Sequence, residues 1–225
     1  MADDSQMKIA AINVRLMQGP DRDPTYVIRA QEELGKLLDE YPESELSPTA
    51  VDILREVNET RATGIKNVGD FYFDRGSYLG SESRYKEVVK DYPNFSGLDE
   101  SLYRLGSSLE NLGRIEEASV YYSRLVAEFP FSGYSERSEE RLLLLERPIP
   151  KVDVAAAEKN AANQKVDKEF SILDPVREAW GIFAGREDPY IVAKRRAAKR
   201  KTLDQDNGSA ELSSGDENGS SGVSP

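Results

Sequence analysis

Few residue types in this sequence could carry out chemistry. Its 225 residues include no histidine and no cysteine, which excludes a Ser–His or Cys–His nucleophile pair and a zinc site built from either residue. Carboxylates remain for acid and base work, and two adjacent pairs stand out, Glu116–Glu117 and Glu139–Glu140. Two carboxylates that flank one bond form the catalytic pair of glycoside hydrolases.

The spacing within these pairs argues against such a role. Adjacent residues on a helix point about 100° apart, so the two carboxylates of one pair do not converge on one substrate. We therefore predict that the protein is not an enzyme, and the sequence indicates no cofactor and no metal site. Hydrolysis by the purified protein would contradict this prediction.

The elements that position the remaining side chains are repeated. Pro42, Pro93 and Pro130 each follow an aromatic residue and an apolar pattern with helical spacing. The three patterns are Leu34, Leu37, Leu38 and Tyr41; Tyr85, Val88, Val89 and Tyr92; and Tyr122, Leu125, Val126 and Phe129. Because proline disfavours the α conformation in the residue before it, each helix should end at its aromatic residue.

Small residues recur in the same register. Ala30, Ser81 and Ala118 each lie twelve positions before a proline, where a small side chain lets two helices approach closely. The second and third copies also share Val68-Gly69 and Leu105-Gly106, and glycines at 76 and 113 that suit a helix end.

The resulting unit is helix, glycine turn, helix and proline stop. Its length and its Leu-Gly, Ala and Pro positions are typical of the ~34-residue tetratricopeptide repeat. We predict an all-α fold, a tetratricopeptide-type α-solenoid of antiparallel helical hairpins with a C-terminal extension. The third copy fits best, and the first helix of the first copy falls in MKIAAINVRLM. Three unrelated amphipathic hairpins are the alternative.

One spacing is irregular. Pro42 and Pro93 lie 51 residues apart, whereas Pro93 and Pro130 lie 37 apart. The excess falls in a stretch that predicts one long helix, or two nearly continuous ones, from about Ser47 to Arg75. After Pro130, SGYSERSEERLLLLERPIP predicts one more helix, which would cap the array and end at Pro148.

The domain prediction follows from where the repeat stops. We expect a repeat array over 1–147, a partly helical extension with a basic end over 148–202, and a disordered acidic tail over 203–225. The segment around Trp180 either docks on the array or binds a partner. The basic cluster 194–201 is either a solvated helix end or a contact for nucleic acid, anionic lipid or an acidic partner.

The composition of the chain limits the classes of partner that it is expected to bind. The chain is 32% charged and carries a net charge of −11, which disfavours nonspecific binding to nucleic acid. No apolar segment reaches the ~18 residues of a membrane span. The acidic start, MADDSQ, is unlike a signal peptide.

Three segments together resemble one branch of the tetratricopeptide proteins, the BamD (YfiO) family of outer membrane protein assembly lipoproteins. They are DRDPTYVIRAQEELGKLLDEYPES, FYFDRGSYLGSESRYKEVVKDYPN and LGRIEEASVYYSRLVAEFPFS. The likeness covers about residues 2–145 and involves the C-terminal repeats of the family only. The sequence differs from the family pattern at its N-terminus, where it shows neither the signal peptide nor the lipid-modified cysteine of the family.

The resemblance implies a scaffold at the periplasmic face of the outer membrane. Its partners would be a BamA-like barrel component and accessory lipoproteins, with membrane contact only through a lipid anchor that this chain lacks. The alternative is a cytosolic tetratricopeptide adaptor unrelated to outer membrane assembly, which the front of the chain favours and the matching segments disfavour.

Helical spacing from Gly69 and Gly106 predicts which side chains are exposed on the concave face of the array. The predicted partner-binding residues are Lys66, Asp70, Phe73, Tyr103, Ser107 and Glu110. Phe73 and Tyr103 are the expected anchors, because exposed aromatic residues often dominate interface energies. Ordinary core packing is the alternative for both.

Overall fold

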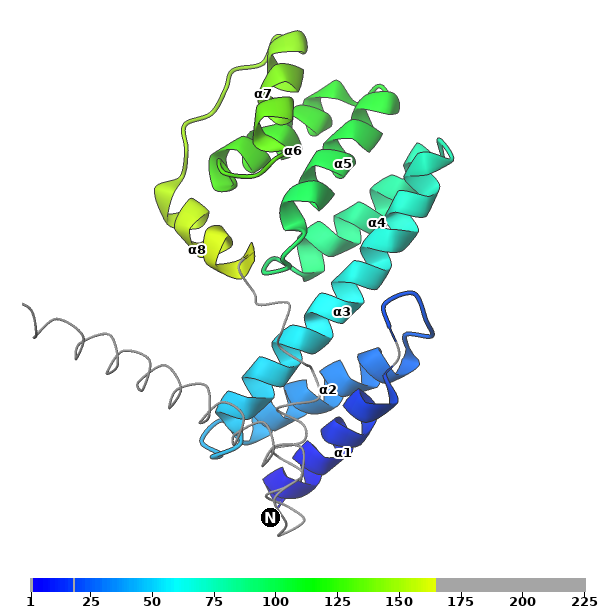
Figure 1. Cartoon of the computed structure of the whole chain (residues 1–225), viewed down its shortest axis with the longest axis vertical. Helices are drawn as coiled ribbons and strands as arrows, with labels where there is room; N and C mark the ends of the chain where they lie inside the picture. The colour runs from blue at the N-terminus through cyan, green and yellow to red at the C-terminus, as the bar shows by residue number, and fades with distance from the viewer. Residues whose placement is uncertain (1, 18, 165–225) are drawn as a thin grey trace, which may run out of the picture. The chain divides into compact units, whose positions relative to one another are not determined.

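The computed structural model describes residues 2–17 and 19–164 (Figure 1), all within the first of two units into which the chain divides after residue 176. The described residues form helices joined by turns, without a strand. The helices are α1 (Ala2–Leu16), α2 (Thr25–Glu40), α3 (Ser47–Asp74), α4 (Tyr78–Asp91), α5 (Leu98–Asn111), α6 (Ile115–Glu128), α7 (Ser135–Leu144) and α8 (Val154–Gln164). The all-α repeat fold predicted from the sequence is confirmed.

The predicted helix ends are found at the aromatic–proline pairs. Helices α2, α4 and α6 stop one residue before Tyr41, Tyr92 and Phe129, whose backbone N–H groups bond to the carbonyl four residues earlier. The turns between hairpin partners use Gly76 and Gly113 at φ of 70° and 75°, a conformation that a side chain disfavours. Local sequence therefore determines where these helices begin and end.

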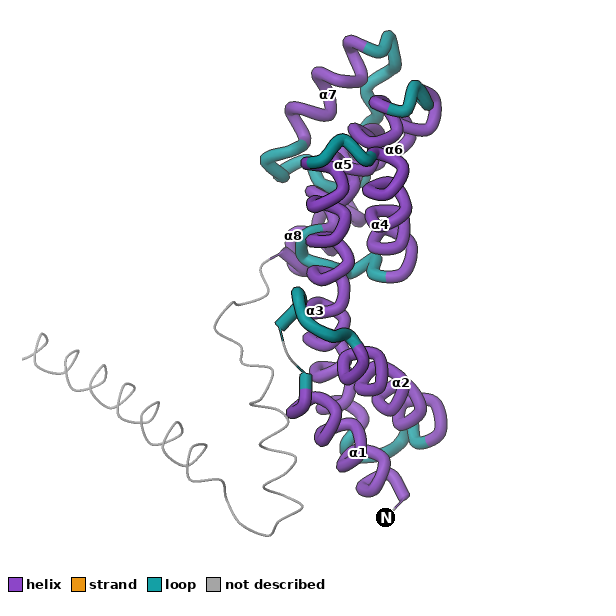
Figure 2. Tube along the Cα trace, turned by 90° about the vertical axis from the view of Figure 1, so that its right-hand side faces the viewer, coloured by secondary structure: helices purple, strands orange, loops and turns teal. Residues whose placement is uncertain are grey.

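From α1 to α7 each helix packs on the next one along the chain, as antiparallel hairpins require, whereas α8 packs on α6. Figure 2 shows the described chain as consecutive helices joined by short turns. One apolar core runs from the second half of α3 through α4, α5 and α6 to Leu142 of α7. The small residues Ala30, Ser81 and Ala118 are fully buried, as predicted.

The long helix is a single one. Helix α3 has 28 residues, twice the 14 of α4, α5 and α6. Its first half packs on α2, where Gln31 Nε2 donates to Asn58 Oδ1 at 2.6 Å, and its second half packs on α4. Figure 1 shows α3 running from α2 to α4. The 14 extra residues between Pro42 and Pro93 thus match one helix length.

The glycines of the second and third copies seat a tyrosine ring. A Cβ added at Gly69 would lie 2.8 Å from the ring of Tyr85, and one at Gly106 would lie 2.7 Å from the ring of Tyr122. Both rings are buried in the core. Glycine therefore sets the close approach of the two helices in each hairpin.

The C-terminal end differs from one expectation. Helix α7 lies where the capping helix was predicted but ends at Leu144, and Glu146 takes a φ of 55°. The following Ala-rich stretch, part of the extension that was predicted to be partly helical, forms α8 and packs on α6. There Asn160 Nδ2 donates to the carbonyl of Glu128 at 3.1 Å. The Trp180 segment, the basic cluster and the acidic tail lie outside the described residues.

Candidate protein-binding surface

Four charged residues link the first helices of two successive hairpins. Lys66 of α3 donates to Asp70 Oδ2 at 2.9 Å and lies 2.8 Å from Glu100 Oε2 of α5. Arg104 of α5 lies 3.3 Å from Glu100 and 3.7 Å from Asp70. All four side chains are between one eighth and about one quarter exposed. Each charge has an opposite neighbour, so this ionic group holds α3 and α5 in register.

The electrostatics of this group follow from burial and pairing. Burial alone would lower the pKa of Lys66, but its hydrogen bonds with Glu100 and Asp70 outweigh that and raise it. Burial together with the hydrogen bond to Asp70 raises the pKa of Tyr85 well above its usual range. Tyr85 therefore donates its hydroxyl proton to Asp70 Oδ1, at 2.6 Å, throughout the neutral range.

Aromatic side chains lie beside the charges. The guanidinium of Arg104 lies 5.2 Å from the ring centroid of Phe73. The ring of Tyr103 lies 5.2 Å from that of Tyr134 and 5.9 Å from that of Tyr122. Phe73, Tyr103 and Tyr134 are partly buried and pack against the core.

The same arrangement continues to α7. Glu110 of α5 accepts hydrogen bonds from Tyr122 Oη at 3.0 Å and from Arg141 Nε of α7 at 3.0 Å. Ser107, one turn before Glu110, is half-buried. We call the set Lys66, Asp70, Phe73, Glu100, Tyr103, Arg104, Ser107, Glu110, Tyr134 and Arg141 the inner face.

The six residues predicted to bind partners all lie on the inner face. The structure corrects their expected exposure: all six are half-buried, because each packs on or bonds to a neighbouring helix. Sequence reasoning missed Glu100, Arg104, Tyr134 and Arg141. The i, i+4 spacing of Glu100 and Arg104 was a usable signal, whereas Arg141 meets Glu110 only through tertiary packing.

The structure gives the adjacent carboxylates separate partners. Glu116 accepts from Arg147 Nη2 at 2.6 Å, whereas Glu117 accepts from Arg114 Nε at 2.6 Å. The two groups are therefore drawn in different directions. Within the described residues no cluster of acids could hold a metal ion.

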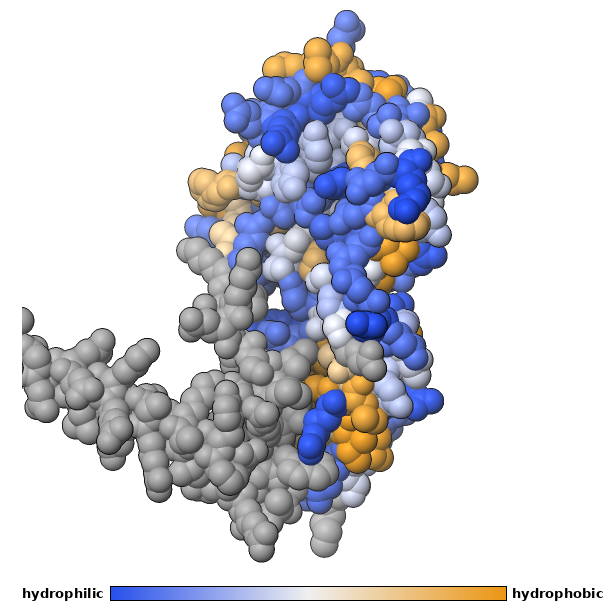
Figure 3. All heavy atoms as spheres, turned by 45° about the vertical axis from the view of Figure 1, so that its right-hand side comes forward, coloured by the Kyte–Doolittle hydropathy of each residue, from blue (hydrophilic) through white to orange (hydrophobic). Residues whose placement is uncertain are grey.

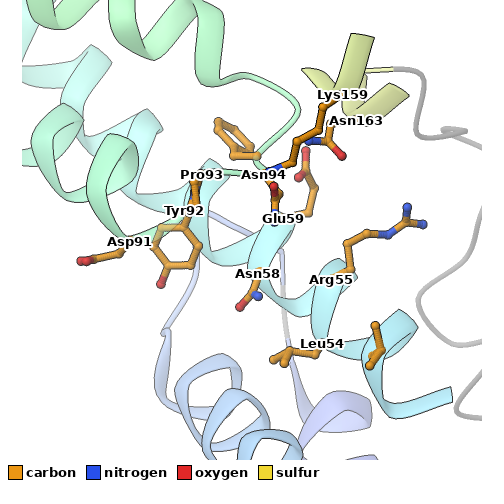
Figure 4. Close-up of a pocket in the computed structure, with 12 residues that line it drawn as sticks. Leu54, Arg55, Asn58, Glu59, Asp91, Tyr92, Pro93, Asn94, Lys159 and Asn163 are labelled. Atoms are coloured by element: carbon orange, nitrogen blue, oxygen red, sulfur yellow. The ribbon is translucent and has the colours of Figure 1, made fainter. Parts of the chain in front are cut away.

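One hollow lies where the turn between α4 and α5 meets the middle of α3. Figure 4 shows Tyr92, Pro93 and Asn94 of that turn near Glu59 of α3, with Lys159 of α8 close by. Its volume is about 390 Å³. Its polar walls bond to the fold: the backbone N–H of Ser96, for example, donates to Glu59 at 3.2 Å. This hollow therefore fits a joint between helices better than a ligand site.

A second hollow, of about 500 Å³, lies along the second half of α3. We call it the α3 groove. Its lining includes Arg61, Ile65, Val68, Phe71 and Tyr72 of α3, Asp21 and Arg22 from the turn before α2, and Arg84 of α4. Val68, Phe71 and Tyr72 are 44%, 51% and 36% exposed. On the face of the molecule drawn in Figure 3, hydrophobic residues form separate groups among hydrophilic ones.

The helical hairpins, their glycine turns and the long helix α3, which packs on both α2 and α4, define a tetratricopeptide-type repeat protein. Comparison with known families is more specific. The family model described as YfiO, outer membrane lipoprotein, matches residues 6–122, just over half of the chain, and the protein belongs to this family. The match begins in α1 and ends in α6, so it takes in the inner-face residues of α3 and α5 and the α3 groove.

Two curated relatives agree with the family. The chain is 25% identical over 114 residues to outer membrane protein assembly factor BamD of Neisseria meningitidis, and equally to that of Neisseria gonorrhoeae. Each match covers 51% of this chain and 43% of the relative. The chain thus matches less than half the length of these relatives. None of the helices within residues 2–17 and 19–164 is long and apolar enough to span a membrane.

Proposed function

We propose that the protein is a non-enzymatic interaction component of the machinery that assembles outer membrane β-barrel proteins. The family match over residues 6–122 is the observation that carries this proposal. The curated relatives bear the name of an assembly factor, and the adjacent carboxylates Glu116 and Glu117 bond to different arginines. The match weighs against an adaptor unrelated to the outer membrane.

The inner face is the surface we assign to partner binding. The ring of Phe73 packs on the core and lies beside Arg104, and the rings of Tyr103 and Tyr134 pack on the core and on each other. Side chains that are already ordered lose little conformational entropy when a partner binds. Tyrosine and arginine are also the residue types that most often dominate interface energies.

The proposed partners are the BamA-like barrel component and accessory lipoproteins, at the periplasmic face of the outer membrane. A repeat array suits this role because each hairpin adds surface without altering its neighbours. Several proteins can then bind to different hairpins at once.

The test removes the two aromatic side chains of the inner face. Phe73→Ala with Tyr103→Ala in the full chain should weaken binding to the purified barrel component in detergent at least tenfold, measured by biolayer interferometry. Leu143→Ala is the matched control, because Leu143 is 62% exposed on α7 and lies outside the inner face. Circular dichroism and urea midpoints establish that each variant is folded. Unchanged affinity in a folded double variant would refute the role of the inner face.

A further inference from the structure

Helices α3 and α5 occupy equivalent positions in successive repeats. Gly69 and Gly106 lie 37 residues apart and seat equivalent tyrosines. The same offset places Val68, Phe71 and Tyr72 at the positions of Leu105, Ser108 and Leu109. The three α5 residues are fully buried, whereas the three α3 residues are roughly half exposed. The same helix face is therefore buried on α5 and partly exposed on α3.

The cover on α5 is the second helix of the preceding hairpin. Helix α4 packs on α5, and Ser81 Oγ of α4 lies 2.8 Å from Ser108 Oγ in a buried hydrogen bond. Phe71 of α3 holds the position equivalent to Ser108. Any helix that packs on α3 as α4 packs on α5 would therefore bury Phe71.

No described helix of the chain takes that position on α3. Helix α2 precedes α3 but packs on its first half, beside the buried residues Ile53 and Val57. Figure 1 shows α2 alongside that first half only. The turn before α2 touches α3 at Gly64, where an added Cβ would lie 2.4 Å from the carbonyl oxygen of Pro20, and at Asn67, whose Nδ2 donates to Asp21 Oδ1 at 2.6 Å. Residues of this turn form one wall of the α3 groove, and Val68, Phe71 and Tyr72 of α3 remain exposed beside it.

The shape of the groove suits an α-helix. Val68 and Tyr72 follow the i, i+4 spacing of one helical face and Phe71 lies beside Tyr72, while Ile65, one turn earlier, is buried in the core. An amphipathic helix binds such a face by laying its own apolar stripe along it. Half-exposed aromatic side chains in a hollow of about 500 Å³ supply the apolar area that such docking buries.

The charges at the rim select the partner. Three arginines line the groove, Arg22, Arg61 and Arg84, with Asp21 as the one acid of the lining. Glu87 pairs with Arg61 at 3.9 Å and with Arg84 at 2.9 Å. A net positive rim remains on a chain whose overall net charge is −11. Opposite charge across an interface favours correct encounter and disfavours like-charged competitors.

We propose that the α3 groove binds an amphipathic α-helix of a partner protein, with acidic residues beside its apolar stripe. The partner helix takes the place that α4 takes on α5 and so completes the interrupted repeat. This inference rests on the proposed role as an interaction protein and assigns it a second surface. Phe71 and Phe73 lie two residues apart on α3 and so point about 200° apart, which separates the groove from the inner face.

The test uses a peptide of defined charge. The probe is a labelled, end-blocked peptide with the sequence of α6, IEEASVYYSRLVAE, which carries an apolar stripe and a net charge of −2. Its matched control has the three glutamates changed, Glu116→Lys, Glu117→Lys and Glu128→Lys. Fluorescence anisotropy with the full chain should show saturable binding of the acidic peptide and at least tenfold weaker binding of the basic one.

A change in the groove checks the location. Phe71→Ser installs the residue that α5 carries at the equivalent position, and because Phe71 is half exposed the fold is expected to tolerate it. Phe71→Ser should weaken binding of the acidic peptide at least tenfold, whereas Leu143→Ser on α7 should change its affinity by less than twofold. A urea midpoint for each variant verifies folding. Equal affinity of the two peptides, or binding that Phe71→Ser does not change, would overturn the proposal.

Two further readouts separate the alternatives. Light scattering that shows a dimer, lost in Phe71→Ser, would mean that a second copy of the chain occupies the groove and would overturn the assignment to a partner. Binding of the full chain to the barrel component tests the inner face independently of the groove. If the chain does not bind the barrel component but does bind the acidic peptide, the proposed function is refuted and the groove proposal is retained. If the chain binds the barrel component but not the acidic peptide, only the groove proposal is refuted.

Discussion

Adding one methyl group at Gly106 tests how the hairpins are held together. An added Cβ would lie 2.7 Å from the ring of Tyr122, closer than a Cβ ordinarily approaches another atom. The ring cannot move aside easily, because it is buried and its hydroxyl donates to Glu110, which is held in turn by Arg141. Gly106→Ala should therefore strain the contact between α5 and α6.

The magnitude follows from two opposing terms. Overpacking a well-packed core costs about 1 to 3 kcal/mol, while replacing a helical glycine with alanine gains about 1 kcal/mol. Gly35→Ala is the matched control, since Gly35 lies inside α2 and an added Cβ there meets nothing within 4 Å. It should stabilise the protein by about 0.5 to 1 kcal/mol. The difference between the two variants isolates the steric term, about 1 to 3 kcal/mol.

Urea unfolding followed by far-ultraviolet circular dichroism measures both variants. With a slope of about 1 to 3 kcal/mol per molar urea, the two midpoints should differ by roughly 1 M, with Gly106→Ala the lower. A second substitution, Tyr122→Leu, removes the ring and should abolish most of the penalty of Gly106→Ala in a double-mutant cycle. If Gly106→Ala and Gly35→Ala unfold at the same midpoint, the account of glycine-set helix packing is wrong.

Two other predictions concern hydrogen bonds to carboxylates that are largely shielded from water. Burial alone would raise the pKa of Glu82, but hydrogen bonds from Lys86 and Arg114 hold it below its ordinary value of 4.5. Its stabilising effect is therefore present above pH 4.5 and lost as the pH falls through the lower folded-state pKa. Glu82→Gln should cost about 1 kcal/mol at pH 7 and progressively less below pH 4.5, as urea midpoints across that range would show; a constant difference would contradict this. Tyr85→Phe removes the proton donor to Asp70 and should cost about 1.5 kcal/mol at pH 7 by the same measurement, whereas an unchanged midpoint would show that the bond contributes nothing net.

Much of the fold was predictable because its signals are local. Aromatic–proline pairs determine three helix ends, since the backbone restriction acts on the residue next to the proline. Gly76 and Gly113 determine two turns, since their positive φ suits a residue without a side chain. The stretch from about Ser47 to Arg75 predicted one long helix or two nearly continuous ones, and the structure has one helix of 28 residues, α3.

Helical spacing predicted which residues of α3 and α5 share a face but not how exposed they are. It placed Tyr103 and Glu110 on one side of α5. It gave no information on which neighbours would cover them, and Tyr134 and Arg141 do so from the next hairpin. The packing of α8 on α6 likewise could not be predicted from the sequence, because it depends on contact between helices far apart in the chain.

The sequence alone determined the repeat, the positions of its helix ends and turns, and its family resemblance. Apolar periodicity, glycine and proline are local signals that affect the backbone over only a few residues. Only the tertiary structure decided which of the repeated faces are covered. Leu105 and Val68 hold equivalent positions in the repeat, yet Leu105 is fully buried and Val68 is 44% exposed. Burial is a property of the neighbouring helices, and the 14 extra residues of α3 displace α2 from the face where Val68 and Phe71 lie.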